Sequence, residues 1–152
     1  MIVKGELWHL LYLTQRGLRP EDVAAIEAFT IYKPDERWVM DSYKSAIASL
    51  ALLHDGMPVV FTAVYPTAPG CLFSWTVGHE VMKNHVREWF PACRRFFDHF
   101  FESGYHRIEC DVLQGFDGAE RTIQHLGFEK EGVRRSLGID RRDAIMYARI
   151  KP

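Results

Sequence analysis

The sequence has few cysteines, and none is arranged to hold a metal ion. Cys71, Cys93 and Cys110 stand in apolar runs, and the chain contains no CxxC pair and no Cys/His pair at zinc spacing. An odd number of cysteines in apolar surroundings is typical of buried free thiols in a reducing compartment. We therefore expect a cytoplasmic protein without a metal site.

The chain also lacks a long apolar segment and an excess of charge of either sign. The apolar run over residues 7–13, "LWHLLYL", is too short to span a bilayer, and no small-residue cleavage site accompanies it. With 19 basic and 20 acidic residues, the net charge is −1, which provides no bulk attraction to nucleic acid or acidic membranes. We expect neither among its partners.

Apolar and aromatic residues, by contrast, are abundant. Hydrophobic residues make up 47% of the 152 positions, and ten Phe, six Tyr and four Trp are among them. This is enough apolar surface for a packed core, and no repeat, low-complexity tract or linker divides the chain. We expect residues 1–152 to form a single domain.

The first half of the chain has patterns of both strands and helices. They predict a strand, two helices and a hairpin, over residues 7–13, 19–29, 34–50 and 50–65 respectively. The first is a short continuous apolar run, which suits a strand buried on both faces. Pro20 followed by two acidic residues is typical of the first turn of a helix. Asp55-Gly56 between two apolar runs is a strong signal for a tight hairpin turn.

The second half alternates strands and helices before it ends in a hairpin. The predicted strands span residues 71–77, 106–113, 129–139 and 143–150, and the predicted helices span residues 84–103 and 116–128. Apolar residues at steps of three and four mark the helix over 84–103, in which Pro91 predicts a kink or a restart. Asp117 suits the cap of the next helix, and Gly127 suits its end.

A strand, a long helix and a strand in succession imply a right-handed parallel crossover within an otherwise antiparallel sheet. The predicted fold is therefore α/β, a mixed and mostly antiparallel sheet with a central parallel strand pair and helices on both faces. Residues 71–77 and 107–113 form the parallel pair. A crevice near the carboxyl ends of such strands is the usual ligand site of an open sheet.

The C-terminal stretch "AERTIQHLGFEKEGVRR" resembles the GNAT acyltransferase superfamily. A small residue, a helix, Leu-Gly-Phe and a strand opening with Glu-Gly carry the resemblance. The matching residues are Ala119, Leu126, Gly127, Phe128, Glu131 and Gly132. The closing hairpin and the order of elements are also similar to those of the family. A vaguer likeness is to short GNAT-like proteins of tailed phages.

The resemblance implies that acetyl-coenzyme A binds where the central strand meets the long helix. Family members hold its pyrophosphate with free N–H groups of a glycine-containing loop at the positive end of the helix dipole. The corresponding segment, "WTVGHEVMKN", supplies the candidate cofactor-binding residues Trp75, Thr76, Val77, Gly78, Met82, Lys83 and Asn84. It has one glycine where the family has a pair, so a plain capped helix start is the alternative.

Two further positions depart from the family pattern. Many members have an Asn where this chain has Phe116, and a Tyr that protonates the leaving thiolate where it has Ile123. An isoleucine side chain cannot donate a proton, although the thiolate of coenzyme A is a fair leaving group. The acid must then come from elsewhere or from water.

Acyl transfer to an amine also requires a base that leaves the attacking nitrogen uncharged. His79 and Glu80 follow the central strand directly. Asp111 and Glu109 alternate with apolar residues, so that one face of their strand is acidic and able to meet an amine. We take Glu80, His79 and Asp111 as candidate catalytic residues. Solvated loop side chains, and ion pairs with nearby Arg or Lys residues, are the alternatives.

Two hypotheses follow from these patterns. The first is an N-acetyltransferase that transfers an acetyl group from acetyl-coenzyme A to an amine of a small molecule or protein. Strand N–H groups near residues 75–77 would bond the carbonyl oxygen. The second is a catalytically degenerate GNAT-like binding protein, which could be of phage origin. The absence of the glycine pair, the Asn and the Tyr favours this hypothesis. A homodimer is compatible with both.

Overall fold

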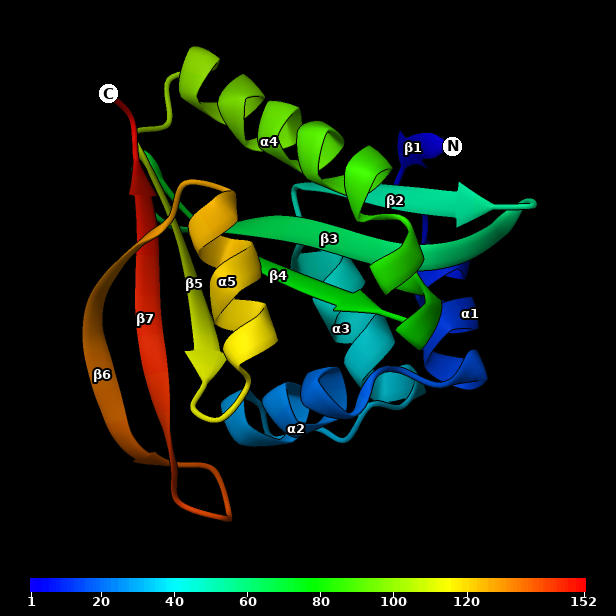
Figure 1. Cartoon of the computed structure of the whole chain (residues 1–152), viewed down its shortest axis with the longest axis horizontal. Helices are drawn as coiled ribbons and strands as arrows, with labels where there is room; N and C mark the ends of the chain where they lie inside the picture. The colour runs from blue at the N-terminus through cyan, green and yellow to red at the C-terminus, as the bar shows by residue number, and fades with distance from the viewer.

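A computed structural model describes residues 1–152 and contains seven strands, five α-helices and one 3₁₀ turn (Figure 1). In chain order these are β1 (Ile2–Lys4), α1 (Leu7–Arg16), α2 (Pro20–Phe29), α3 (Glu36–Ser45), β2 (Ala48–His54), β3 (Met57–Ala68), β4 (Cys71–Gly78), η1 (Glu80–Asn84), α4 (Val86–Glu102), β5 (Arg107–Leu113), α5 (Asp117–His125), β6 (Glu129–Leu137) and β7 (Arg142–Ile150). No helix is both long enough and apolar enough to cross a membrane.

All seven strands belong to one sheet, in the order β1-β2-β3-β4-β5-β7-β6. Every neighbouring pair is antiparallel except β4 and β5, which run parallel. The β4–β5 ladder has only three residue pairs, from Cys71 with Arg107 to Phe73 with Glu109. Figure 1 shows the two strands diverging beyond it. The predicted mixed sheet with a central parallel pair is therefore confirmed.

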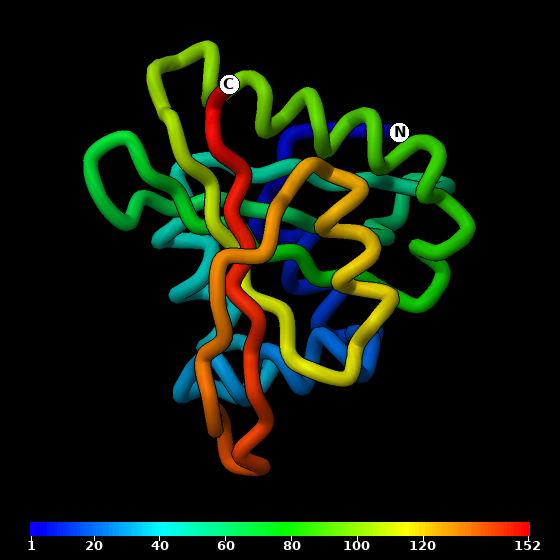
Figure 2. Tube along the Cα trace, turned by 60° about the vertical axis from the view of Figure 1, so that its left-hand side comes forward, coloured from blue at the N-terminus to red at the C-terminus, as the bar shows by residue number.

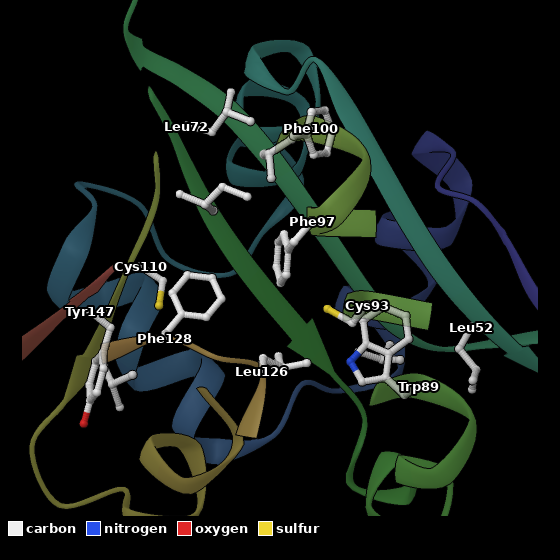
Figure 3. Close-up of a cluster of buried hydrophobic side chains, with 14 of the residues drawn as sticks. Leu52, Leu72, Trp89, Cys93, Phe97, Phe100, Cys110, Leu126, Phe128 and Tyr147 are labelled. Atoms are coloured by element: carbon white, nitrogen blue, oxygen red, sulfur yellow. The ribbon is translucent and has the colours of Figure 1, made fainter. Parts of the chain in front are cut away.

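A separate apolar core lies on each face of the sheet. The first core joins the sheet to α4 and the end of α5, and it includes Trp89, Phe97 and Phe128 (Figure 3). The rings of Phe97 and Phe128 meet edge to face, with centroids 5.4 Å apart. The second core joins the sheet to α1, α2 and α3 and includes Leu10 and Trp38. The predicted placement of helices on both faces is confirmed.

The strand predicted over residues 7–13 is wrong, because these residues form most of α1. His9, Leu10 and Leu13 are buried, while the residues between Leu10 and Leu13 are half exposed. This spacing is that of one side of a helix, which the unbroken apolar run conceals in the sequence. The backbone N–H of Glu6 donates to Nδ1 of His9 at 2.9 Å and fixes the first turn. The true first strand is the shorter β1.

Three other local predictions also need correction. The helix predicted over 34–50 is shorter, because residues 48–50 pair with β3 as the start of β2. Of the kink or restart predicted at Pro91, the restart does not occur: α4 runs through Pro91, since a proline removes only one hydrogen bond and the apolar side of α4 is packed on the core. Asp117 is the first residue of α5, and Phe116 occupies the cap position before it.

The last two strands form a long hairpin that extends beyond the rest of the sheet (Figure 2). β6 pairs only with β7 and is mostly exposed. Its turn contacts α2, because an ideal Cβ placed on Gly138 would lie 3.0 Å from Cβ of Ala28. The hairpin therefore bounds the space between α2 and the sheet.

Candidate active site

The ladder between β4 and β5 ends at Phe73 and Glu109, and beyond it the two strands face each other unpaired. His79, just after β4, donates its N–H to β3. Backbone groups alternate between the two neighbours of a strand, so Thr76 directs its N–H and carbonyl toward β5. At the end of β5, Gln114 donates its N–H to the carbonyl of Asp143 beside β7, so the backbone groups of Asp111, three residues earlier, are directed toward β4. Unpaired backbone groups therefore line both edges of this gap.

One cavity, of about 460 Å³, lies on the side of the gap covered by α4 and α5. We call it the α4–α5 cavity. Of its 25 lining residues, 15 are hydrophobic, including Trp89, Phe97 and Ile123. Its charged lining residues are Arg19, Glu21, Asp22, Glu80, Lys83 and Asp111. It is therefore an apolar slot with charged groups of both signs.

A second cavity, of about 560 Å³, lies between the sheet and helices α2 and α3. We call it the α2–α3 cavity. Its aromatic lining residues are Phe29, Tyr32, Trp38, Tyr65, Phe73 and Trp75. Its charged lining residues are Asp22, Asp41, Glu109, Asp111 and Arg134. Each cavity is lined by six aromatic residues and four carboxylates, but this one has a single cation, Arg134, and two tyrosine hydroxyls, from Tyr32 and Tyr65, which the first lacks.

The two cavities meet at the gap in the sheet. Five residues line both, namely Asp22, Ala25, Trp75, Thr76 and Asp111. Two of these, Thr76 and Asp111, lie on the facing unpaired edges of β4 and β5. A group held in one cavity can therefore reach a group held in the other only where β4 and β5 have separated.

Asp22 ties α2 to the separated end of β4. It accepts hydrogen bonds from Nε of Arg19 at 2.9 Å, from Nη2 of Arg19 at 2.8 Å and from the N–H of Gly78 at 2.8 Å. The backbone N–H of Arg19 in turn donates to the carbonyl of Gly78 at 3.0 Å. This bidentate ion pair satisfies backbone groups that β5 leaves unpaired. It thereby stabilises the gap.

Asp111 is a buried carboxylate that forms an ion pair but accepts no hydrogen bond. Its side chain is 7% exposed and accepts no hydrogen bond, and the nearest cation, Nη2 of Arg134, is 3.6 Å away. Burial raises the pKa of Asp111, Arg134 opposes the rise, and Glu109 adds to it. A carboxylate with a raised pKa is a stronger base than an exposed one. Asp111 is thus suited to accept a proton at the gap.

The segment after β4 is a closed 3₁₀ turn instead of an open glycine loop. Nδ1 of His79 accepts from the N–H of Val81 at 3.3 Å, and the carbonyl of His79 accepts from the N–H of Met82 at 3.0 Å. The side chain of Met82 fills the space beside Gly78, where an added Cβ would lie 2.6 Å from Sδ. These amides are not free to bind an anion. No side chain, however, caps the start of α4.

The predicted cofactor residues divide between the cavities. Trp75 and Thr76 line both, Met82 and Lys83 line the α4–α5 cavity, and Val77 lines the α2–α3 cavity. Gly78 lines neither, because its backbone bonds to α2. Asn84 lies in a third hollow, beside His54 and His85. Their roles remain predictions.

The candidate bases are also not all brought together. Asp111 lines both cavities and Glu80 lines the α4–α5 cavity, whereas His79 lines neither and its ring caps η1. Glu109 pairs with Arg107 at 2.6 Å and Asp111 with Arg134 at 3.6 Å, as the ion-pair alternative expects. Asp111 is therefore the best placed of the three candidates.

The positions that depart from the family pattern both line the α4–α5 cavity. Phe116 and Ile123 are among its lining residues, and no tyrosine is. Cys110 lines it as well, but burial raises the pKa of this thiol far above neutrality, so it is not a nucleophile. No group of three or more His, Cys, Asp or Glu side chains is suited to hold a metal ion.

Sequence patterns missed Arg19 and Asp22. The stretch that holds them is typical of a helix start, where an acidic residue usually faces solvent. One signal was available, because an Arg and an Asp three residues apart can pair on one side of a helix. Nothing local shows that the pair is buried against Gly78, which is 56 residues from Asp22.

The architecture was compared with those of known proteins. No family model matches the sequence, and no curated protein matches it. Among solved structures, a ribosomal-protein-alanine N-acetyltransferase from Brucella melitensis is similar, with a TM-score of 0.74 and 14% identity over 99% of each chain. A ribosomal-protein-S18-alanine N-acetyltransferase from Escherichia coli has a TM-score of 0.72 and 16% identity over 99% of this chain and 92% of that one.

A GNAT-family acetyltransferase from Bacillus anthracis is also similar, with a TM-score of 0.73 and 15% identity over 98% of this chain and 93% of that one. At such low identities the likeness concerns the fold. The chain therefore has the GNAT acyltransferase fold, as the C-terminal resemblance predicted. Its chemistry has to be argued from the site.

Proposed function

We propose that this protein is an N-acetyltransferase that transfers an acetyl group from acetyl-coenzyme A to an amine. The observation that carries the proposal is the gap between β4 and β5, which opens onto a cavity on each face of the sheet. The α4–α5 cavity suits the pantetheine arm, because an extended chain with amide groups can pair with an exposed strand edge. The α2–α3 cavity then receives the amine.

In this proposal, acetyl-coenzyme A supplies a thioester carbonyl as the electrophile. The N–H of Thr76 points into the gap and stabilises the negative charge that develops on the carbonyl oxygen. Asp111 accepts a proton from the attacking amine as the carbon–nitrogen bond forms and the carbon–sulfur bond breaks. Water delivers a proton to the departing sulfur, because no tyrosine lines the α4–α5 cavity. Proton loss by the amine and proton gain by sulfur balance the reaction.

Lys83 and the start of α4 are the groups suited to hold the diphosphate. Lys83 lines the α4–α5 cavity and lies next to the uncapped end of α4. The N–H groups at a helix start attract phosphates. Because the η1 amides bond within the turn, we expect more of the binding energy to come from the pantetheine slot than from a phosphate loop.

Calorimetry with acetyl-coenzyme A tests the proposal. We expect a micromolar dissociation constant, and release of coenzyme A thiol when an amine acceptor is added. Ala119→Trp places an indole in the α4–α5 cavity and should abolish binding, whereas Arg121→Leu changes an exposed residue of the same helix outside the cavity. Absence of heat and of any melting shift at millimolar ligand would refute the proposal. Gly78 is a poor target, because Met82 fills the space beside it.

One observation favours the second candidate, a binding protein without catalysis. The amides of Val81 and Met82 are bonded to His79, which reduces the groups available to a diphosphate. If this closure has removed cofactor binding, the same calorimetry should detect none for the unmodified protein. The two candidates thus give opposite results in one experiment.

A further inference from the structure

The α2–α3 cavity holds a buried carboxylate that has an ion-pair partner but accepts no hydrogen bond. The Asp111 side chain is more than nine-tenths buried, lines the cavity and accepts no hydrogen bond, and Arg134 stands 3.6 Å away with half of its own side chain exposed. A buried carboxylate without hydrogen-bond donors is costly, and a ligand ammonium would supply donors that Arg134 does not. The oxygens of Asp111 are therefore the unsatisfied acceptors of this cavity.

The other carboxylates of this cavity are already engaged. Asp22 is satisfied by Arg19, Glu109 pairs with Arg107, and Asp41 accepts from the hydroxyl of Tyr32. These pairs leave Asp111 as the carboxylate with a free side toward the cavity. An incoming amine is thus directed to the position next to Thr76 and the gap.

Aromatic rings surround the approach to Asp111. Tyr65 and Phe73 lie on neighbouring strands with ring centroids 5.3 Å apart, and Trp75 contacts Trp38 edge to face at 5.6 Å. Phe73 of β4 lies opposite Glu109 of β5 in the short parallel ladder, and Glu109 is two residues before Asp111 along β5. Burial raises the pKa of Tyr65, with Asp111 adding to the rise, so its hydroxyl stays protonated near Asp111. Flat aromatic faces suit a planar ligand group, and they also attract cations.

The cavity is closed to an extended chain at the hairpin turn. An ideal Cβ on Gly138 would lie 3.0 Å from Cβ of Ala28, so α2 and the β6–β7 turn are in contact there. A peptide lying beside a strand needs a separation of about 4.8 Å from it, plus room for its own side chains. A peptide is therefore excluded from the passage between α2 and the β6–β7 turn, whereas a small molecule needs no exit there.

Together these features identify an acceptor class, an inference that rests on the proposed acetyl transfer. We infer that the amine acceptor is a small arylalkylamine, whose ammonium binds Asp111 and whose ring lies between Tyr65, Phe73 and Trp75. Acetylation would then form a bond from the amine nitrogen to the acetyl carbon and break the carbon–sulfur bond of the donor. Asp111 takes the first proton from the ammonium, which gives the neutral amine that attacks. Nitrogen loses a second proton as the carbon–nitrogen bond forms, water delivers one proton to the departing sulfur, and the other is released to solvent.

A set of three ligands separates charge from aromaticity. 2-Phenylethylamine has both, 2-phenylethanol lacks the charge, and 2-cyclohexylethylamine lacks the aromatic ring. In calorimetry without any thioester, we expect 2-phenylethylamine to bind at least about tenfold more tightly than either of the others. A seven-residue peptide with a free N-terminal alanine should bind more weakly still. Equal affinities for the three small ligands, or tighter binding of the peptide, would overturn the inference.

Matched variants assign the effect to the cavity. Asp111→Asn should remove the advantage of the amine over the alcohol, and Phe73→Leu should remove the advantage of the aromatic ring over cyclohexyl. Glu129→Gln changes an exposed carboxylate on β6 outside both cavities and should change neither ratio. If the ratios are unchanged in folded Asp111→Asn and Phe73→Leu proteins, as judged by thermal melting, the inference fails.

The binding readout is independent of acetyl transfer. Selective binding of 2-phenylethylamine without turnover would refute the proposed function and leave the ligand class in place. Turnover of spermidine or of the alanine peptide, without binding of 2-phenylethylamine, would support the function and refute the ligand class.

Discussion

The two cavities that meet at the β4–β5 gap differ in chemistry although they share the same strands. The α4–α5 cavity is walled by apolar helix side chains, and no tyrosine lines it. The two cavities have equal numbers of aromatic residues and carboxylates, but the α2–α3 cavity has one cation where the other has two, and it has the hydroxyls of Tyr32 and Tyr65. The difference arises within β5, where Ile108, Cys110 and Val112 belong to the core under α4 while Glu109 and Asp111 line the other cavity.

This contrast shows how a two-residue strand period assigns two roles to one strand. Adjacent side chains of β5 point to opposite faces of the sheet, so one face is apolar and the other is acidic. The gap is needed as well, because a continuous ladder would separate the two faces completely. We expect changes on each face to affect different steps.

The largest effect should come from the residue that holds the gap open. Asp22→Ala leaves the Arg19 guanidinium without its buried partner and the N–H of Gly78 without an acceptor. Removing one partner of a buried pair costs about 3–5 kcal/mol, so we expect a loss of that order in urea unfolding. The exposed pair of Arg142 and Asp140 provides the control, because Asp140→Ala should cost at most about 1 kcal/mol. Similar losses for both variants would contradict the proposed role of Asp22.

The next largest effect should distinguish the two faces in function. Asp111→Asn removes the proposed base and the ammonium partner, so we expect kcat/KM for the amine to fall about 100-fold. Affinity for acetyl-coenzyme A should change less than about threefold, because the pantetheine slot uses the backbone of Asp111 and not its carboxylate. Steady-state kinetics and calorimetry measure the two quantities. A parallel loss of donor affinity would show that the faces are not independent.

Strand alternation explains which parts of the site the sequence could predict. The family resemblance implied Trp75 and Thr76, and strand alternation predicted Asp111 on a polar face; all three line both cavities. The hairpin at Asp55-Gly56 was predicted from turn chemistry, and both residues have the positive φ, 50° and 76°, that such a turn requires. Signals of this kind depend on neighbours in sequence and remain visible without the fold.

The parts that were missed depend on contacts that are distant in sequence. The apolar run of α1 has no visible period, and only burial of Leu10 and Leu13 against the sheet reveals the helix. Likewise, the sequence predicts Gly78 as a cofactor contact, but its N–H donates to Asp22 and the side chain of Met82 fills the space beside it. In both cases tertiary packing determines the structure, and the local sequence pattern does not reveal it.

A smaller effect should follow from restoring the acid that the α4–α5 cavity lacks. Ile123 lines that cavity, and Ile123→Tyr adds a hydroxyl able to protonate the departing sulfur. Because the thiolate is already a fair leaving group, we expect kcat to rise by only about tenfold. Ile123→Phe adds the ring without the hydroxyl and should not raise kcat. If the two variants behave alike, the leaving group needs no acid from this position.

The smallest expected effect concerns stability and has the opposite sign to the effect on activity. Burial raises the pKa of Asp111 in the folded protein, so its protonated form is favoured there, and stability is lost as the pH rises through that pKa. Asp111→Asn cannot ionise, and its melting temperature relative to the unmodified protein should therefore increase between pH 4 and pH 7, by about 2–4 °C for each kcal/mol gained. Glu131 is a control of opposite sign, because the hydrogen bond from Arg107 lowers its pKa and its contribution is lost as the pH falls. Melting curves at pH 4 and at pH 7 test the expectations for Asp111 and for Glu131. If Asp111→Asn were the less stable protein at pH 7, attraction to Arg134 would outweigh the cost of burial, and Asp111 would be a structural partner of Arg134 instead of a base held ready for a ligand.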